Sequence, residues 1–152
     1  LIGNMDNDIY YMLGNLYEDK EKSEQAYRLA ARGEFNLSSA MYYNDQPPQM
    51  MYYSAKAIEA LGDKDEAKKR FNAFIEYANN HMNDEMKIDY FAVSLPDFLI
   101  FEGDLNKNNK VHCNLMAALG YLGIGDNDNA QKYAKQGLEL NQCHAELRDI
   151  VK

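Results

Sequence analysis

Histidine and cysteine stand side by side twice in this chain, at His112-Cys113 and at Cys143-His144. Imidazole and thiolate groups are preferred zinc ligands, and a thiolate beside an imidazole can act as a nucleophile. Adjacent side chains of a helix point about 100° apart, however, so that they cannot readily bind one ion. The chain also has no CxxC or HxxxH spacing. We therefore predict no metal site and two free thiols, although a Cys113–Cys143 bridge across one helical hairpin is geometrically possible.

The segment that starts at Asp104 begins like a calcium-binding loop. Such a loop needs glycine at its sixth position and an acidic residue at its twelfth. Asn109 and Leu115 occupy these two positions here. We expect instead a polar loop that leads into a helix beginning near Asn108.

Glu85 and Asp89 form an i,i+4 carboxylate pair that could raise the pKa of one partner and so provide a general acid. A solvated helix face is the commoner origin of such a pair. The chain has no GxSxG motif, no HExxH motif and no activated Cys–His arrangement. We therefore predict that the chain is not an enzyme and uses no cofactor.

Composition restricts the class of protein and the class of partner. The chain has 152 residues, of which 46% are hydrophobic and 26% charged, as is typical of a single globular domain. Its 24 acidic and 16 basic residues give a net charge of −8, and no stretch is basic. This charge argues against a nucleic-acid partner, because phosphate binding needs clustered lysine and arginine.

Neither a membrane segment nor a signal peptide is apparent. No apolar run approaches the roughly 18 residues that a membrane-spanning helix needs, so we predict no membrane insertion. A first residue of Leu1 in place of methionine predicts a piece of a longer protein. Two cysteines in a chain of this length favour a reducing compartment, which here means the cytoplasm.

A repeat of small residues organises the chain. Gly14, Ala55 and Ala118 each stand twelve residues before an alanine, at Ala26, Ala67 and Ala130. Small residues let two helices approach closely, so this pattern predicts three helical hairpins. Tyr17, Ile58 and Tyr121 are expected to fill the space between the paired helices, and Gly33, Phe74 and Gly137 to take a late position in the second helices.

The turns of these hairpins have their own signals. Gly62-Asp63 and Gly125-Asp126 fit a glycine that ends one helix and an aspartate that caps the next. The first hairpin has Glu18-Asp19-Lys20-Glu21 at its turn instead. Pro47-Pro48 interrupts the helices, and Pro48 suits the first position of a new one.

This pattern resembles the tetratricopeptide repeat superfamily, whose unit is a helix–turn–helix of about 34 residues. The resemblance implies an all-α fold: a tetratricopeptide-like array of about three helical hairpins, wound as a right-handed solenoid. Equivalent positions are 41 residues apart between units one and two (Gly14 to Ala55) and 63 apart between units two and three (Ala55 to Ala118). The second excess predicts an inserted helix at about 84–93, which Pro96 ends. We place the units at about 7–40, 48–81 and 111–144, the insert at about 82–110, and a terminal capping helix at about 144–152, all in one domain.

Two further segments, Tyr43–Pro48 and Lys87–Phe98, are similar to those of a group of large bacterial proteins. Members of that group carry an uncharacterised N-terminal β-sandwich region that is followed by such repeats. The resemblance implies that this chain is the C-terminal repeat region of a protein of that kind.

The superfamily implies a binding groove on the concave side, where set positions of the first helices contact a partner. The matching residues are Tyr11, Asn15, Gln49, Tyr52, Lys56, His112, Leu115, Leu119 and Leu122. We expect the tyrosines to be anchors and the polar residues to bind peptide backbone or carboxylates. Alternatively, the tyrosines pack against other helices or another domain, and the leucine-rich third unit is covered.

Two functions follow, and the sequence leaves both open. The first is a protein-interaction module that binds a peptide or a protein surface in the concave groove. The second is a scaffold that packs against its own parent chain or against a second copy in a homo-oligomer. Twelve tyrosines and eight methionines in a small array suit either function.

Overall fold

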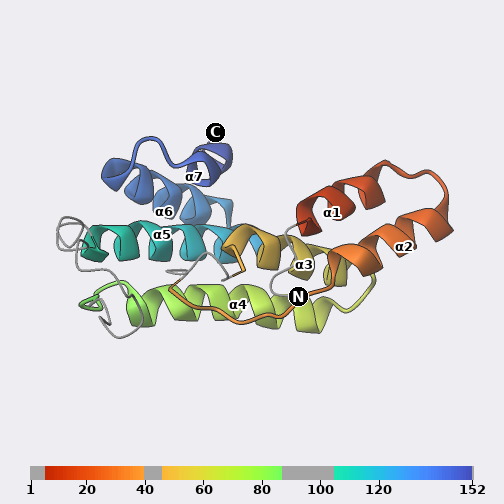
Figure 1. The fold of residues 1–152 in the computed structure, drawn as a ribbon, viewed down its shortest axis with the longest axis horizontal. Coiled ribbons are helices and arrows are strands. Elements are labelled where there is room, and N and C mark those ends of the chain that lie inside the picture. Colours follow the sequence, from red (N-terminus) through yellow and green to blue (C-terminus); the bar gives the residue numbers. More distant parts are fainter. Residues whose placement is uncertain (1–5, 40–45, 87–104, 152) are drawn as a thin grey trace, which may run out of the picture.

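The computed structural model describes residues 6–39, 46–86 and 105–151, and these residues form seven α-helices and no β-strand (Figure 1). The all-α prediction is confirmed. The helices are α1 (Asn7–Leu16), α2 (Lys20–Ala30), α3 (Pro48–Ala60), α4 (Lys64–His81), α5 (Leu105–Gly123), α6 (Asn127–Leu140) and α7 (Ala145–Ile150).

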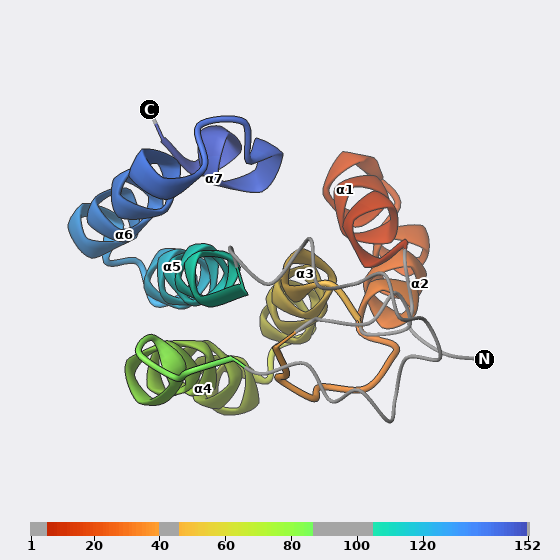
Figure 2. The same cartoon turned by 60° about the vertical axis from the view of Figure 1, so that its left-hand side comes forward.

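Consecutive helices pair as hairpins, α1 with α2, α3 with α4, and α5 with α6. Each later hairpin packs on the one before it, through contacts of α3 with α1 and α2 and of α5 with α3 and α4. The short helix α7 packs on α5 and α6. Figure 2 shows that α1 and α7 lie on the same side of α3 and α5, at opposite ends of the array, while α4 lies on the other side.

The hairpin turns form as their sequence predicts. Gly62 and Gly125 have φ of 104° and 84°, a left-handed conformation that favours glycine. The carboxylates of Asp63 and Asp126 accept hydrogen bonds of 3.1 Å from the backbone N–H of Glu66 and Asn129. These contacts satisfy N–H groups that the first turn of a helix leaves without a partner.

The first hairpin turns without such a glycine. The Asp19 side chain still caps α2 by accepting a 3.0 Å hydrogen bond from Lys22 N–H. Gly14 is where the paired helices approach most tightly, because a Cβ there would lie 2.5 Å from a ring carbon of Tyr27. The expected close approach at the small residues is thus confirmed, and Ala55, Ala67, Ala118 and Ala130 are at most 1% exposed.

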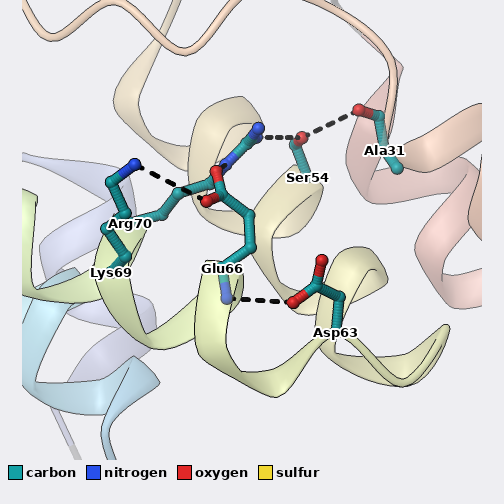
Figure 3. A network of polar contacts seen from close by, with 6 residues as sticks. All are labelled: Ala31, Ser54, Asp63, Glu66, Lys69 and Arg70. Atoms are coloured by element: carbon teal, nitrogen blue, oxygen red, sulfur yellow. Dashed lines mark hydrogen bonds and ion pairs between the residues drawn. The ribbon is translucent and has the colours of Figure 1, made fainter.

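A polar network joins the first two hairpins (Figure 3). Arg70 on α4 binds Glu66 (Nε to Oε1, 2.9 Å) and donates to the Ser54 hydroxyl on α3 (3.4 Å). That hydroxyl donates in turn to the carbonyl of Ala31, just beyond α2 (3.2 Å). The Arg70 guanidinium also lies 5.0 Å from the centre of the Phe35 ring. The ion pair lowers the pKa of the Glu66 carboxyl, mainly through the hydrogen bond from Arg70.

Two details of the first hairpin were predicted wrongly. Tyr17 does not fill the space between the helices, because it is 43% exposed at the end of α1. Gly33 lies beyond α2, which ends at Ala30. The buried Asn7 side chain donates to the carbonyls of Ala30 and Arg32 (2.6 and 2.8 Å). The last carbonyl groups of a helix have no partner within the helix. The Asn7 amide bonds to that of Ala30 and to the carbonyl of Arg32 just beyond it, so that α2 ends before Gly33.

The region before α5 also differs from its prediction. Residues 84–86 are not helical, and the remainder of the helix expected at about 84–93 lies outside the described residues, as does Pro96. Helix α5 begins at Leu105 and not near Asn108. Its first turn exposes polar side chains but turns Asn109 inward, where the amide donates to the carbonyl of His81 (2.7 Å). The helix was expected to begin later because polar side chains on the solvent side of a helix have the same composition as a loop.

Candidate functional site

Aromatic side chains form a continuous row across α1 and α3. The ring centres of Tyr11 and Tyr53 are 5.6 Å apart, and Tyr53 and Tyr52 follow at 5.4 Å. The row continues on α2 at Tyr27, 5.9 Å from Tyr11, and on α4 at Phe71, 5.8 Å from Tyr52. Such separations are typical of favourable aromatic pairs, so the row holds its members in fixed positions.

Tyr52 is the member of the row that belongs to the core. It packs against all three clusters of buried residues, including those around Phe71, Phe74 and Leu119. Burial is the main reason that the pKa of its phenol lies well above the ordinary value. Tyr52, which was predicted to be a binding anchor, therefore serves mainly to pack the hairpins against one another.

Tyr53, which the sequence analysis missed, is only half-buried. The pKa of its phenol is raised, first by burial and then by the charges of Asp8 on α1 and Asp149 on α7. Two carboxylates from opposite ends of the array thus act on one aromatic side chain. Neighbouring side chains on a helix point about 100° apart. The rotation of α3 about its axis therefore decides which of Tyr52 and Tyr53 faces the core and which faces the surface.

The predicted polar residues near this row already have partners within the chain. The Tyr27 hydroxyl donates to Asn15 Oδ1 (2.8 Å), and the Lys56 ammonium forms an ion pair with Glu59 one turn later on α3. A partner that binds Asn15 or Lys56 must share or replace these contacts.

Gln49 connects α3 to the terminal helix. Its amide donates to the Glu146 carboxylate of α7 over 3.0 Å. Because residues 49 and 146 are distant in the sequence, no local pattern indicates this contact. It places a further acidic side chain beside the first turn of α3.

The predicted residues of the third hairpin lie elsewhere. Leu115 and Leu119 are 3% and 4% exposed, in a core cluster with Leu147 and Ile150 of α7, against which Leu122 also packs. Helix α7 therefore covers these leucines. His112 contacts the carbonyl of Ser38 through Nε2 (2.8 Å) and the Tyr77 ring (6.1 Å between centres). The structure thus brings together only the predicted residues of α1 and α3.

The side chains considered for metal or acid–base chemistry do not assemble among the described residues. Cys113 and Cys143 are both free thiols, the first buried and the second exposed. Burial, and then the charge of Asp84, raises the pKa of Cys113 to about 11, which keeps the thiol protonated. No group of three His, Cys, Asp or Glu side chains converges within the described ranges. Glu85 is exposed, and Asp89 lies outside these ranges.

Acidic groups dominate the surroundings of the Tyr11–Tyr53 pair. The charges of Asp8 and Asp149 act on Tyr53, Glu146 binds Gln49, and Glu59 pairs with Lys56. We call Tyr11, Tyr53, Asp8 and Asp149 the tyrosine site.

One comparison with known proteins bears on this arrangement. Residues 8–29, which span nearly all of α1 and α2, match the family model described as tetratricopeptide repeat. The chain is a tetratricopeptide-like helical array. No solved structure matches it.

Tetratricopeptide repeats are non-catalytic units that generally mediate protein–protein interaction. The match over residues 8–29 therefore suggests protein partners. Within the described ranges, no helix is both long enough and apolar enough to cross a bilayer.

Proposed function

We propose that this array is a non-catalytic interaction module that binds a peptide or protein segment in a concave groove, at the surface of α1 and α3 that carries the tyrosine site. The observation that carries the proposal is the Tyr11–Tyr53 pair, which α1 and α3 hold 5.6 Å apart on that side. Partly exposed tyrosines on a rigid scaffold are typical anchors of protein interfaces, because they contribute contact area at little cost in side-chain entropy.

The charges at the tyrosine site indicate the chemistry of the bound segment. The charges of Asp8 and Asp149 both act on Tyr53, and Lys56 on the same helix is already paired with Glu59. A lysine or arginine side chain placed over a tyrosine ring would gain a cation–π contact as well as these carboxylates. We therefore propose a basic segment as the partner, and the net charge of −8 would steer it to the site.

Peptide selection tests this proposal. We would select ligands from a random peptide library on the folded chain and measure their affinities by fluorescence anisotropy. Selected peptides are expected to be rich in lysine or arginine and to bind more weakly as salt is raised. Tyr53→Ala and Tyr11→Ala should each weaken binding by about tenfold or more, as substitution of a central anchor does.

Tyr17→Ala is the matched control, because Tyr17 is an exposed tyrosine at the far end of α1. Circular dichroism would establish that each variant is folded. Selection without enrichment of cations would contradict the basic partner. Equal affinities of wild type, Tyr11→Ala and Tyr53→Ala would contradict the groove itself.

A second candidate function is a scaffold that packs against its own parent chain, as the C-terminal repeat region of a larger protein, or against a second copy. The observation that favours it is a row of exposed apolar side chains on α1, Ile9, Met12 and Leu16, which borders the tyrosine site on the same helix.

A further inference from the structure

Helix α1 exposes an apolar stripe that its neighbours leave uncovered. Ile9, Met12 and Leu16 are 57%, 50% and 77% exposed, and their spacing of i, i+3 and i+7 puts them on one side of the helix. We call these three residues the α1 stripe. Single exposed apolar residues are ordinary, but three on one side of a helix make a contiguous patch.

The later hairpins bury the positions equivalent to Ile9 and Leu16. Counted from Gly14, Ala55 and Ala118, Ile9 corresponds to Met50 on α3 and Cys113 on α5, which are 8% and 0% exposed. Leu16 corresponds to Ala57, which is 0% exposed, and to the buried Gly120. Met12 corresponds to Met116 on α5, which is buried, and to Tyr53 on α3, which is half-buried and packs against Tyr11 of α1. The exposure of the stripe is therefore a property of the first hairpin alone.

The preceding hairpin lies against each of these helices, and at Gly120 the covering element is its second helix. A Cβ at Gly120 would lie 2.7 Å from the backbone oxygen of Phe71 and 2.7 Å from Ile75, both on α4. Helix α3 packs against both helices of the preceding hairpin, and at Ser54, the position equivalent to Leu13, it bonds to the carbonyl of Ala31 just beyond α2. The α1 stripe thus continues an interface that the array forms twice.

The surface beside the stripe is hollowed. A cavity of about 140 Å³ opens between α1 and α2, lined by the apolar Tyr10, Leu13, Tyr17 and Leu29 with Lys22 and Gln25. A side chain that entered this cavity would be fixed to both helices of the hairpin.

The other end of the array is finished differently. Helix α7 turns Leu147 and Ile150 into the core, at 0% and 9% exposure, and exposes Arg148 and Asp149. Helical repeat arrays need terminal units with a polar outer face, and α7 provides one. The charged outer face of α7 is thus a poor match for the apolar α1 stripe.

We propose that a further helical hairpin of the same polypeptide, encoded upstream of Leu1, packs on the α1 stripe. Its second helix occupies the position that α2 has against α3 and that α4 has against α5, and presents an apolar stripe of its own. This inference extends the scaffold function and is independent of peptide binding at the tyrosine site.

The test compares the 152-residue chain with the natural polypeptide that includes its upstream residues. Leu16→Glu should leave the Tm of the short chain unchanged, because the side chain is exposed there. In the long polypeptide the same substitution buries a charge and should lower the Tm by about 5 °C or more. Leu61→Glu is the control, because Leu61 is 38% exposed at the end of α3 and should be neutral in both chains.

Three results would overturn the proposal. The first is a natural polypeptide in which Leu16→Glu is as neutral as Leu61→Glu, and the second is one without upstream residues. The third is a short chain that forms dimers, measured by light scattering, which Leu16→Glu dissociates, because a second copy is then the occupant. Peptide affinity measured on the Leu16→Glu variant separates these results from a failure of the groove.

Discussion

The two ends of this helical array differ in what their outer faces expose: charged side chains at the C-terminal end and apolar side chains at the N-terminal end. At the C-terminal end, a six-residue helix buries Leu147 and Ile150 and leaves charged residues outside. At the N-terminal end, α1 packs against α2 and α3 on its inner side but exposes the α1 stripe on its outer side. The comparison indicates that the two ends of a repeat array can differ in how their outer faces are covered, and α1 has one side packed in the array and another exposed.

The largest expected effect comes from exchanging the same side chain at the two ends. Leu147→Ala removes a fully buried side chain of α7 and should lower the free energy of unfolding by about 3 kcal/mol. Leu16→Ala, at 77% exposure, should change it by less than about 0.5 kcal/mol. Urea titrations of both variants measure the difference, and equal effects would show that the ends are alike.

A second pair of substitutions examines equivalent positions along the array. Gly120→Ala puts a Cβ 2.7 Å from the Phe71 backbone oxygen, which cannot move aside as a side chain can. We expect a loss of about 2 kcal/mol from overpacking. Leu16→Met, at the equivalent position of α1, should be neutral. A Gly120→Ala variant as stable as the wild type would show that Gly120 on α5 is not packed more tightly than the equivalent Leu16 on α1.

The junction between the first two hairpins should have an intermediate effect. Arg70→Ala removes the hydrogen bond to Ser54 and the contact with the Phe35 ring, and should cost about 1–2 kcal/mol in the free energy of unfolding. Arg70→Lys keeps the charge but loses the planar guanidinium, so it should restore only part of this loss.

The same network predicts a dependence on pH. The folded chain lowers the pKa of Glu66, so its ionised carboxylate stabilises the fold above its unfolded pKa. This contribution is lost as the pH falls through the lowered, folded pKa. Thermal melts of the wild type and Glu66→Gln should differ at neutral pH and converge in acid. A difference that persisted at the lowest pH would contradict the ion pair.

The smallest effect concerns the tyrosine site, where charges from α1 and α7 both act on Tyr53. Asp149→Asn removes one of the charges that raise the pKa of Tyr53, so that the phenol should ionise at a lower pH. Ultraviolet titration against a Tyr53→Phe reference follows this group. Asp128→Asn, on the exposed first turn of α6, is a control that should leave the titration unchanged. An unaltered titration of the Asp149→Asn variant would separate α7 from the site.

Local signals in the sequence predicted much of the fold. The glycine–aspartate turns at Gly62 and Gly125, the small residues at the helix contacts and Pro48 at the start of α3 act within a few residues of their position. They therefore remain valid whatever packs around them. The early end of α2 was missed because it depends on Asn7, which is more than twenty residues away.

The candidate site was less predictable, because it is assembled over long sequence distances. Leu115 and Leu119 occupy groove positions by register, yet the short α7 covers them. Tyr53 was not predicted because it stands next to Tyr52, and only the rotation of α3 decides which of the two is buried in the core. The carboxylates that give the site its charge come from α1 and α7, at opposite ends of the chain.

The most direct test of the central claim, that α1 serves a partner on its concave face, is a backbone amide NMR titration of the chain. A lysine- or arginine-containing peptide from the selection would be added to the labelled protein. We predict that the largest shift changes fall on Asp8, Tyr11, Tyr53 and Asp149, with none centred on Leu16. Changes confined to the α1 stripe and the neighbouring Leu29 would contradict the account.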